Sequence, residues 1–261
     1  MPGNESNGVG NFWYSFDYGL AHFISLDGET DHANSPSKSF ADDVKGDEKL
    51  PKESETKPID SGPFGSVKGN VKDNKAYEQY QWLKDDLASV NRTKTPWVIA
   101  MSHRPMYSSH STDAQKNTRD AFEALMLQYK VDAYLAGHIH WYERLFPMGK
   151  NGALDMDSVV NNNTYVTNPG KSMTHLINGA AGNVESFTPW KKSDHLKNIT
   201  AVLNREDFGF SKLTVVNSTA LKWDYVLGTN GSEGDSLWLL KSSGSKQARQ
   251  PRAVALDGLA A

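Results

Sequence analysis

The sequence contains no cysteine in its 261 residues. Disulfide bonds, thiol nucleophiles and thiolate metal sites are therefore excluded, which leaves histidine, aspartate, glutamate, asparagine and tyrosine as possible metal ligands. There is also no uninterrupted apolar stretch long enough to cross a bilayer, and the polar opening MPGNESNGVG contains no signal-peptide core. We expect neither a membrane partner nor a signal peptide in this sequence.

An excess of positive charge is missing as well. The 28 Lys and Arg residues are outnumbered by 31 Asp and Glu residues, and the formal net charge is -3. A chain without a basic field does not gather nucleic acid, so we expect no nucleic-acid partner. The hydrophobic fraction of 38% suits a packed globular protein. Composition does not indicate an oligomeric state, which stays unknown.

Six Asn-x-Ser/Thr sequences, the acceptor sites for N-glycosylation, favour a secreted and glycosylated parent protein. Chance would give about three in a chain this rich in asparagine, so an accidental origin stays equally open. The six sequences begin at Asn4, Asn91, Asn162, Asn198, Asn217 and Asn230.

The first part of the chain predicts a β-hairpin followed by a long insertion. The apolar, aromatic segments 12–18 and 21–26 read as the two strands of the hairpin. Residues 33–69 are rich in Ser, Pro, Lys, Asp and Gly and contain few apolar residues. This stretch is longer than an ordinary connection, so we expect a surface insertion loop.

Helices and strands alternate in the next part. Apolar residues recur at steps of three and four over 76–90 and again over 116–129, which predicts two amphipathic helices. Short apolar runs at 97–101 and 131–136 predict buried strands. A strand, helix, strand unit normally forms a parallel pair with a right-handed crossover, so both strands end at one sheet edge, where ligands bind.

Beyond Pro147 the pattern changes to short alternating segments, for which we expect antiparallel strands of a second sheet layer. These segments are 173–177, 209–216, 220–227 and 236–241. Residues 242–261 have no periodicity and predict a disordered tail, which leaves 1–241 as the folded unit.

Three histidines follow the two predicted parallel strands. His103 comes just after the strand at 97–101, and His138 and His140 come just after the strand at 131–136. Residues two apart in extended chain point to the same side, so the His-x-His spacing would present both imidazoles to a space shared with His103. Neutral imidazole is a common ligand of zinc, iron and manganese. The pattern therefore predicts a metal site at this edge.

Four segments resemble consecutive blocks of the purple acid phosphatases, of the fungal secreted type, in the calcineurin-like metallophosphoesterase superfamily. They are GNFWYSFDYGLAHFISLD, PWVIAMSHRPMYSS, KVDAYLAGHIHWYER and INGAAGNVES. The resemblance covers roughly residues 10–241. It implies the C-terminal part of the catalytic domain, with an α/β fold that is a four-layer metallophosphoesterase sandwich (α/β/β/α) whose N-terminal part is missing.

The resemblance also implies hydrolysis of phosphate monoesters at acid pH by a dinuclear centre of Fe3+ with Zn2+, Mn2+ or Fe2+. His103 and His138 match ligands of the divalent ion, and His140 matches a ligand of the ferric ion. The family's motifs Gly-Asp-x-Gly, Gly-Asp-x-x-Tyr and Gly-Asn-His-Asp/Glu, which supply four more ligands, have no counterpart here. Because anionic ligands offset the repulsion between two cations, we expect this chain to hold at most one divalent ion, weakly.

Other polar residues near the histidines are weaker candidates. The acids Asp27, Glu29 and Asp31 follow an early strand, and we expect solvated loop acids rather than replacement ligands. His110, in the loop after His103, is a candidate catalytic acid or phosphate contact, and a surface position explains it equally well. Four residues flanking the ligands are candidates for orienting them through hydrogen bonds, with packing or ion pairing as the alternative. These four are Arg104, Tyr107, Glu143 and Arg144.

The sequence therefore predicts an acid phosphatase-type metallohydrolase, truncated and impaired because the upstream ligands are absent. Two alternatives stay open. One is a non-catalytic metallophosphoesterase-like fragment or binding domain. The other is a phosphodiesterase or nucleotide hydrolase of the same superfamily, since one fold hosts several reactions.

Overall fold

The structure, a computed structural model, describes residues 2–32, 35, 76–110, 113–183, 185–191 and 196–242. Apart from Ser35 and Ser242, the predicted insertion over 33–69 and the predicted tail over 242–261 lie outside these residues. Within the described ranges, none of the helices has both the length and the apolarity that crossing a bilayer requires.

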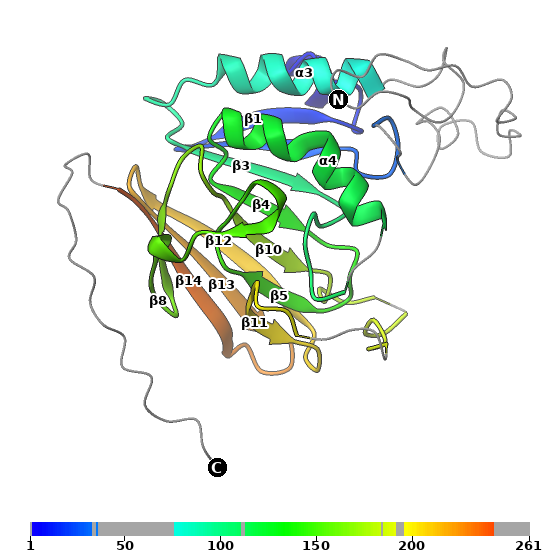
Figure 1. The fold of residues 1–261 in the computed structure, drawn as a ribbon, viewed down its shortest axis with the longest axis vertical. Helices are drawn as coiled ribbons and strands as arrows, with labels where there is room; N and C mark the ends of the chain where they lie inside the picture. Colours follow the sequence, from blue (N-terminus) through cyan, green and yellow to red (C-terminus); the bar gives the residue numbers. More distant parts are fainter. Residues whose placement is uncertain are drawn as a thin grey trace, which may run out of the picture.

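Two large stacked β-sheets and two long helices dominate the part of the fold that the structure describes (Figure 1). The first sheet has seven strands, in the order β1 (Tyr14–Tyr18), β2 (Ala21–Leu26), β3 (Trp97–Ser102), β4 (Ala133–Ala136), β10 (Thr174–Asn178), β5 (Tyr142–Leu145) and β11 (Thr200–Asn204). Its four consecutive strands from β2 to β10 are parallel. Their carboxyl ends therefore meet at one edge of the sheet.

The second sheet has five strands, in the order β12 (Gly209–Asn217), β13 (Ala220–Leu227), β14 (Glu233–Lys241), β9 (Thr164–Thr167) and β8 (Val159–Asn161). The helix layer consists of α3 (Ala76–Ser89) and α4 (Asp113–Gln128). The remaining elements are short: α1 (Pro2–Glu5), β6 (Met148–Gly149), η3 (Lys150–Gly152), β7 (Ala153–Leu154) and η4 (Met156–Ser158). Among the described residues the sandwich thus has three layers, α/β/β.

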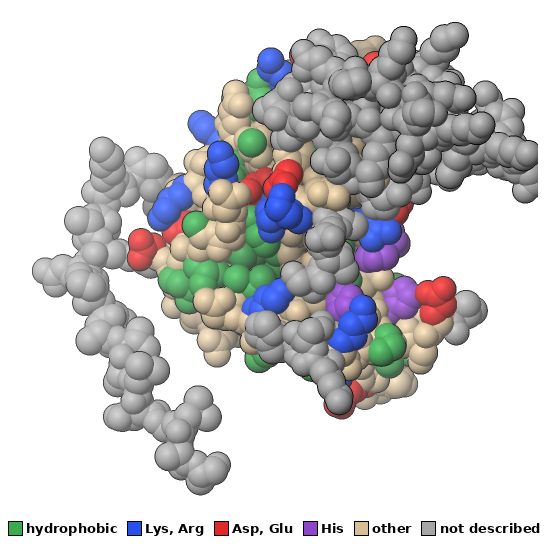
Figure 2. Space-filling model, turned by 45° about the vertical axis from the view of Figure 1, so that its right-hand side comes forward, with side chains coloured by type: hydrophobic (Ala, Val, Ile, Leu, Met, Phe, Trp, Pro, Cys, Tyr) green, Lys and Arg blue, Asp and Glu red, His purple; other side chains and the backbone are tan. Residues whose placement is uncertain are grey.

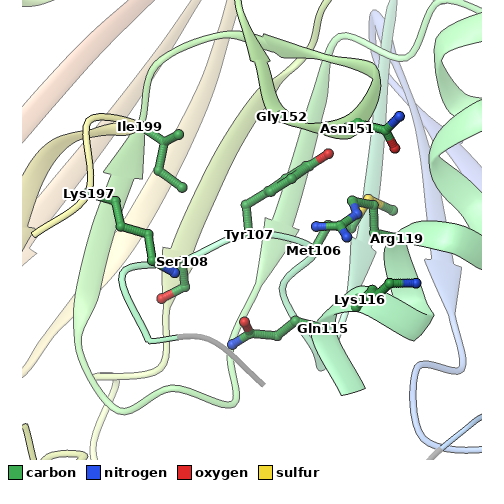
Figure 3. Close-up of a pocket in the computed structure, with 10 residues that line it drawn as sticks. All are labelled: Met106, Tyr107, Ser108, Gln115, Lys116, Arg119, Asn151, Gly152, Lys197 and Ile199. Atoms are coloured by element: carbon green, nitrogen blue, oxygen red, sulfur yellow. Dashed lines mark hydrogen bonds between the residues drawn. The ribbon is translucent and has the colours of Figure 1, made fainter. Parts of the chain in front are cut away.

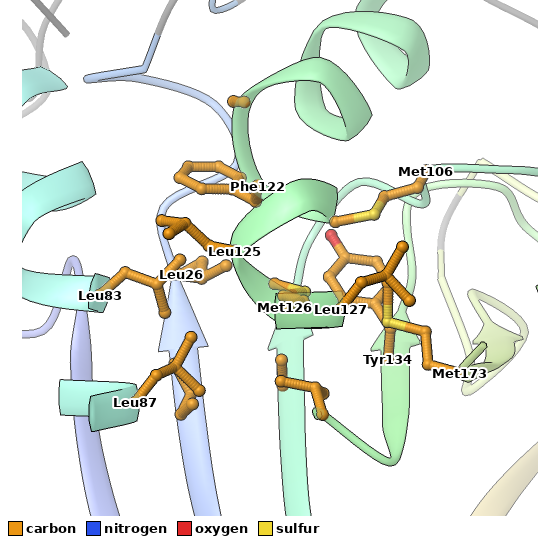
Figure 4. Packing of buried hydrophobic residues seen from close by; sticks show 14 of the residues in the cluster. Leu26, Leu83, Leu87, Met106, Phe122, Leu125, Met126, Leu127, Tyr134 and Met173 are labelled. Atoms are coloured by element: carbon orange, nitrogen blue, oxygen red, sulfur yellow. The ribbon is translucent and has the colours of Figure 1, made fainter. Parts of the chain in front are cut away.

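The helices bury apolar stripes on one face of the seven-stranded sheet (Figure 4). Leu83 and Leu87 of α3 are four residues apart, as are Phe122 and Met126 of α4, and all four side chains are buried. Burying a side chain of this size stabilises the fold by about 1.5–3 kcal/mol. Because the stripes repeat at the helical period, these side chains define which way each helix faces.

The side chains of β3 point alternately to the helix layer and to the second sheet. Val98 and Ala100 belong to the helix-side cluster, whereas Trp97 and Ile99 belong to the cluster between the two sheets. The Trp97 indole N–H also donates to the carbonyl of Asn217, at 2.9 Å, and so ties β3 to the end of β12. A strand covered on both faces reads as a continuous apolar run, as observed in the sequence.

A buried ion pair joins the two sheets. The Arg144 guanidinium on β5 makes two hydrogen bonds to the Asp235 carboxylate on β14, at 2.6 and 2.9 Å. Tyr142 donates its hydroxyl to the same carboxylate at 2.7 Å, and Arg144 donates to the Tyr165 hydroxyl at 2.6 Å. The guanidinium, the carboxylate and the Tyr142 hydroxyl are therefore all hydrogen-bonded, as buried charged and polar groups must be.

Most of the strands and helices predicted from the sequence are confirmed, with ends shifted by a few residues. The hairpin, both helices and the two parallel strands are present, and the last three predicted segments lie in the second sheet. The prediction for residues 173–177 is wrong. They form β10 in the first sheet, parallel to β4 and antiparallel to β5. β10 therefore adds another strand end to the edge that carries the histidines.

Candidate metal centre

The turn after β2 is held rigidly against the end of β3. The Asp27 carboxylate accepts hydrogen bonds from the backbone N–H groups of Glu29 and Thr30, both at 2.9 Å, and from the Thr30 hydroxyl at 2.6 Å. The Gln79 side chain of α3 accepts from the Asp27 N–H at 2.9 Å. Glu29 is therefore carried by a turn with a fixed backbone.

The prediction that the acids of this turn are solvated is wrong. Asp31 is 0% exposed, Asp27 is occupied in holding the turn, and the Glu29 side chain is 32% exposed. The turn lies so close to β3 that a Cβ on Gly28 would be 2.2 Å from the Ser102 Oγ. Any larger residue would have to displace the Ser102 hydroxyl, so glycine favours the close approach that places Glu29 beside the strand end.

His103 and His138 meet at the ends of the neighbouring strands β3 and β4. His103 Nε2 lies 3.0 Å from His138 Nδ1, and the rings pack edge to face. His138 has a φ of 59°, which costs a residue other than glycine about 1–3 kcal/mol. A Cβ on Gly179 would lie 2.0 Å from the Ile139 carbonyl oxygen, so only glycine lets β10 approach this turn. The surrounding chain thus maintains a strained conformation at His138.

Hydrogen bonding assigns the protons of both rings. Arginine can only donate, so His138 Nε2, 2.8 Å from an Arg104 Nη atom, is an acceptor. Neutral His138 then carries its proton on Nδ1 and donates it to His103 Nε2. Burial, reinforced by the Arg104 charge, lowers the pKa of His138 to about 4, and burial also lowers the pKa of His103. Nε2 is therefore the unprotonated nitrogen of both rings, and in each ring its electron pair accepts a hydrogen bond.

Arg104 connects His138 to Glu29. Its second Nη atom donates to Glu29 Oε2 at 2.9 Å. Its Nε lies 2.8 Å from Glu29 Oε1, yet both atoms are buried and neither forms a hydrogen bond within the described residues. Glu29 Oε1 is also 3.7 Å from His103 Nε2. The ligand atoms of Glu29, His103 and His138 all lie within 4.8 Å of one another.

His140 lies next to this group but outside it. Its Nδ1 is 3.0 Å from the carbonyl oxygen of Ser186, and its backbone N–H donates to the Thr188 hydroxyl at 2.8 Å. A carbonyl only accepts, so neutral His140 carries its electron pair on Nε2, which lies 3.9 Å from a Glu185 carboxylate oxygen. The structure thus places His103 and His138 together and leaves His140 outside this group.

The loop that carries His110 is ordered by Glu143. The His110 backbone N–H donates to the Ser108 hydroxyl at 3.0 Å, and that hydroxyl donates to Glu143 at 2.6 Å. His110 is 8% exposed, and its ring lies edge-on to Trp141. Glu143 therefore positions the loop, and its hydrogen bonds within the described residues do not reach an imidazole.

Tyr107 and Arg144 also point to partners other than the three candidate ligands. The Tyr107 hydroxyl donates to Glu123, and Arg144 belongs to the bridge with Asp235. Of the four residues predicted to orient the ligands, Arg104 is the one that contacts a candidate ligand in the described part of the chain. Sequence reasoning assigned Glu29 to a solvated turn, because its position beside His103 depends on contacts between distant segments.

A cavity of about 440 Å3 opens beside the same loop and α4 (Figure 3). Three cationic side chains line it, those of Lys116, Arg119 and Lys197, and the candidate ligands are not in its lining. Figure 2 shows histidine side chains at the molecular surface beside acidic and basic groups. The candidate metal centre is therefore an open edge of the sheet, separate from this cavity.

Two family models match the chain. The model described as "Calcineurin-like phosphoesterase" matches residues 4–142, and the model described as "Iron/zinc purple acid phosphatase-like protein C" matches residues 172–236. The first match contains β1 to β4 and all three candidate histidine ligands, and the second contains β10 to β13.

Three proteins similar to this chain are named acid phosphatases. The chain is 62% identical to "Acid phosphatase" of Aspergillus ficuum, over 93% of the chain and 40% of that protein. It is 34% identical to "Acid phosphatase A" of Cryphonectria parasitica, over 88% of the chain and 39% of that protein. Purple acid phosphatase PPD1 from yellow lupin seeds aligns with a TM-score of 0.60 and 26% identity, over 88% of the chain and 33% of the lupin chain. The chain thus spans about two fifths of the length of these curated relatives.

Proposed function

We propose hydrolysis of phosphate esters as the function, on the premise that this chain belongs to the calcineurin-like phosphoesterase family and, within it, to the purple acid phosphatases. The observation that most supports the proposal is the set of Nε2 electron pairs on His103, His138 and His140 at one sheet edge. Because the relatives are more than twice as long, the activity, substrate and metals of the whole protein enter here as proposals.

The residues present fit a divalent metal ion. Unprotonated imidazole nitrogens and a carboxylate suit Zn2+, Mn2+ and Fe2+. The buried Glu29 oxygen without a hydrogen bond, facing His103, is a site that a cation would satisfy. We propose that His103 and His138 bind the divalent ion, and that His140 is the ligand available to a second, ferric ion. Residues 1–241 are proposed to form part of a metallophosphoesterase catalytic domain.

A bound divalent ion supplies a Lewis acid that polarises phosphoryl oxygens and lowers the pKa of a bound water. The chain's own residues bind and orient the substrate. Arg104 carries planar, always charged donors that match phosphoryl oxygens in a bidentate way. His110, in the loop ordered by Glu143, is the proposed proton donor to the leaving alkoxide of a phosphate monoester.

Hydrolysis of p-nitrophenyl phosphate at acid pH, after loading with iron plus zinc or manganese, tests the function. Metal-dependent turnover that is lost in His138→Ala and kept in His195→Ala, a histidine outside every motif, would support it. Metal binding without any turnover would instead favour a non-catalytic, metallophosphoesterase-like binding domain. Turnover of bis-p-nitrophenyl phosphate without turnover of the monoester would instead identify a phosphodiesterase.

We also propose that the parent protein is secreted and glycosylated. The six sequon asparagines are all exposed in the structure, which is what attachment of a glycan requires. This support is independent of the metal centre.

A further inference from the structure

We propose that Glu29 is a metal ligand, which together with His103 and His138 forms a site for a single divalent cation, and that the Arg104 guanidinium occupies the position of this cation until the metal displaces it. The inference rests on the proposed function, since it concerns the same sheet edge. It adds a ligand that the sequence pattern argues against.

The first argument is the unsatisfied oxygen of Glu29. A buried carboxylate oxygen without a hydrogen bond normally costs about 1–3 kcal/mol or more. Glu29 Oε1 is such an atom: Arg104 Nε forms an ion pair with it at 2.8 Å, but no hydrogen bond joins the two. It faces His103 Nε2 at 3.7 Å. A metal ion bound between Glu29 and His103 would accept an electron pair from Glu29 Oε1, the oxygen that has no hydrogen bond from the guanidinium.

The second argument is the position of Arg104. Its two Nη atoms contact His138 Nε2 at 2.8 Å and Glu29 Oε2 at 2.9 Å, the two acceptors on either side of the cluster. A single positive group therefore already bridges an imidazole lone pair and a carboxylate. A divalent cation would bind the same acceptors with twice the charge. Arg104 is on the loop after β3 and its side chain is long enough to swing towards solvent or a bound phosphoryl group.

The third argument is that the backbone segments carrying the ligands are fixed before any metal binds. Asp27 and Gln79 fix the turn that carries Glu29, and Gly28 allows the turn to touch β3. The strained backbone of His138 is fixed from the other side by β10. A preorganised site loses little entropy on binding. Two imidazoles and one carboxylate with an open position form the ligand set typical of a catalytic zinc site.

This assignment also explains how one ion can be held without the bridging carboxylates of a dinuclear centre. The charge of Glu29 offsets one unit of the ion's two positive charges, while the imidazoles contribute none. A single ion has no neighbouring cation to repel it. The site therefore requires only residues that the described chain contains.

Isothermal titration of the metal-free, full 261-residue chain with Zn2+, together with the visible absorption of its Co2+ complex, tests the proposal. Glu29→Asp and Glu29→Gln should each weaken Zn2+ binding by about tenfold or more and change the Co2+ spectrum. Glu185→Gln, which alters a carboxylate beside His140 instead, is the matched control and should bind as the wild type does. Arg104→Gln should tighten binding several-fold, because no guanidinium has to be displaced.

The double variant Glu29→Gln/Arg104→Gln distinguishes two roles of Glu29, that of a metal ligand and that of an ion-pair partner of Arg104. If Glu29 only neutralises Arg104, removing both charges restores wild-type affinity, and the proposal is overturned. If Glu29 is a ligand, the double variant binds weakly. Wild-type affinity in Glu29→Asp, or unchanged affinity in Arg104→Gln, would also overturn it. Because the readout is metal binding, loss of hydrolysis with Glu29-dependent binding intact would count against the proposed function alone.

Discussion

Replacing Glu143 by glutamine should destabilise the protein strongly without removing a single heavy atom. The carboxylate is 0% exposed and accepts four donors: the hydroxyls of Ser108 (2.6 Å) and Thr200 (2.7 Å), the Trp141 indole N–H (3.1 Å) and the Ser109 backbone N–H (2.9 Å to one oxygen and 3.2 Å to the other). An amide cannot accept all four, because one of its two ends is itself a donor.

The size of the effect follows from which partners can adapt. The two hydroxyls can rotate and accept from the new amide, but an N–H group cannot. With the amide nitrogen at one end, the Trp141 N–H loses its acceptor. With it at the other end, the Ser109 N–H loses its principal acceptor. An unsatisfied buried donor costs about 1–3 kcal/mol. Adding the lost charge assistance of the remaining bonds gives about 2–4 kcal/mol for Glu143→Gln.

Urea denaturation followed by tryptophan fluorescence measures this loss, with Glu185→Gln as the exposed-carboxylate control. Turnover of p-nitrophenyl phosphate should fall as well, because the loop carrying His110 depends on Glu143, while Zn2+ affinity stays near that of the wild type. A free energy of unfolding within about 0.5 kcal/mol of the wild type would refute the reasoning, since it would mean that the carboxylate is not needed as a fourfold acceptor.

Three further predictions follow from other parts of the fold. Arg144→Met should lower the free energy of unfolding by about 3–5 kcal/mol, because it leaves the Asp235 carboxylate buried without its cation. A loss below about 1 kcal/mol in urea denaturation would contradict this. Burial lowers the pKa of His22, but hydrogen bonds and charge from Asp86 and Asp17 outweigh it and raise the pKa above 6.5. That interaction is fully present below pH 6.5 and is lost as pH rises through the raised pKa. The thermal stability of the wild type should therefore fall more between acid and alkaline pH than the thermal stability of His22→Gln does. Parallel dependence of the two stabilities on pH would argue against the ion pairs. Finally, the chain secreted from a eukaryotic host should lose mass on treatment with an endoglycosidase, and an unchanged mass would show that the exposed sequons are unused.

The parallel strands, the helices and the meeting of His103 with His138 follow from local patterns in the sequence, whereas the separation of His140 does not, because His138 is not in extended chain. Val98, Ala100 and their neighbours form an unbroken apolar run because both faces of β3 are covered, and the stripe of Leu83 and Leu87 repeats at the period of a helix. Local patterns do not say which sheet a short strand joins. β10 is one of four parallel strands, yet its five residues resemble an edge segment of the second sheet in length and composition.

Glu29 is the clearest case of a residue whose role the local sequence does not reveal. Its neighbours Asp27 and Asp31 give the appearance of an acidic, solvated turn. What changes its environment is Gln79, 52 residues after Asp27, which closes the turn onto α3 and brings Glu29 to the ends of β3 and β4.

The same long-range closure makes the proposed metal centre depend on the rest of the fold. His103 and His138 come from neighbouring strands, whereas Glu29 comes from a turn whose position depends on α3. Any cation held by all three therefore joins the hairpin, the helix layer and the strand ends. Its binding energy adds to folding stability as long as the unfolded chain binds it less well. A change at Gln79, whose hydrogen bonds to Asp27 and Asp31 close the turn, should consequently weaken metal binding although Gln79 is not a proposed ligand. A residue far from Glu29 in sequence would then control the affinity of the site.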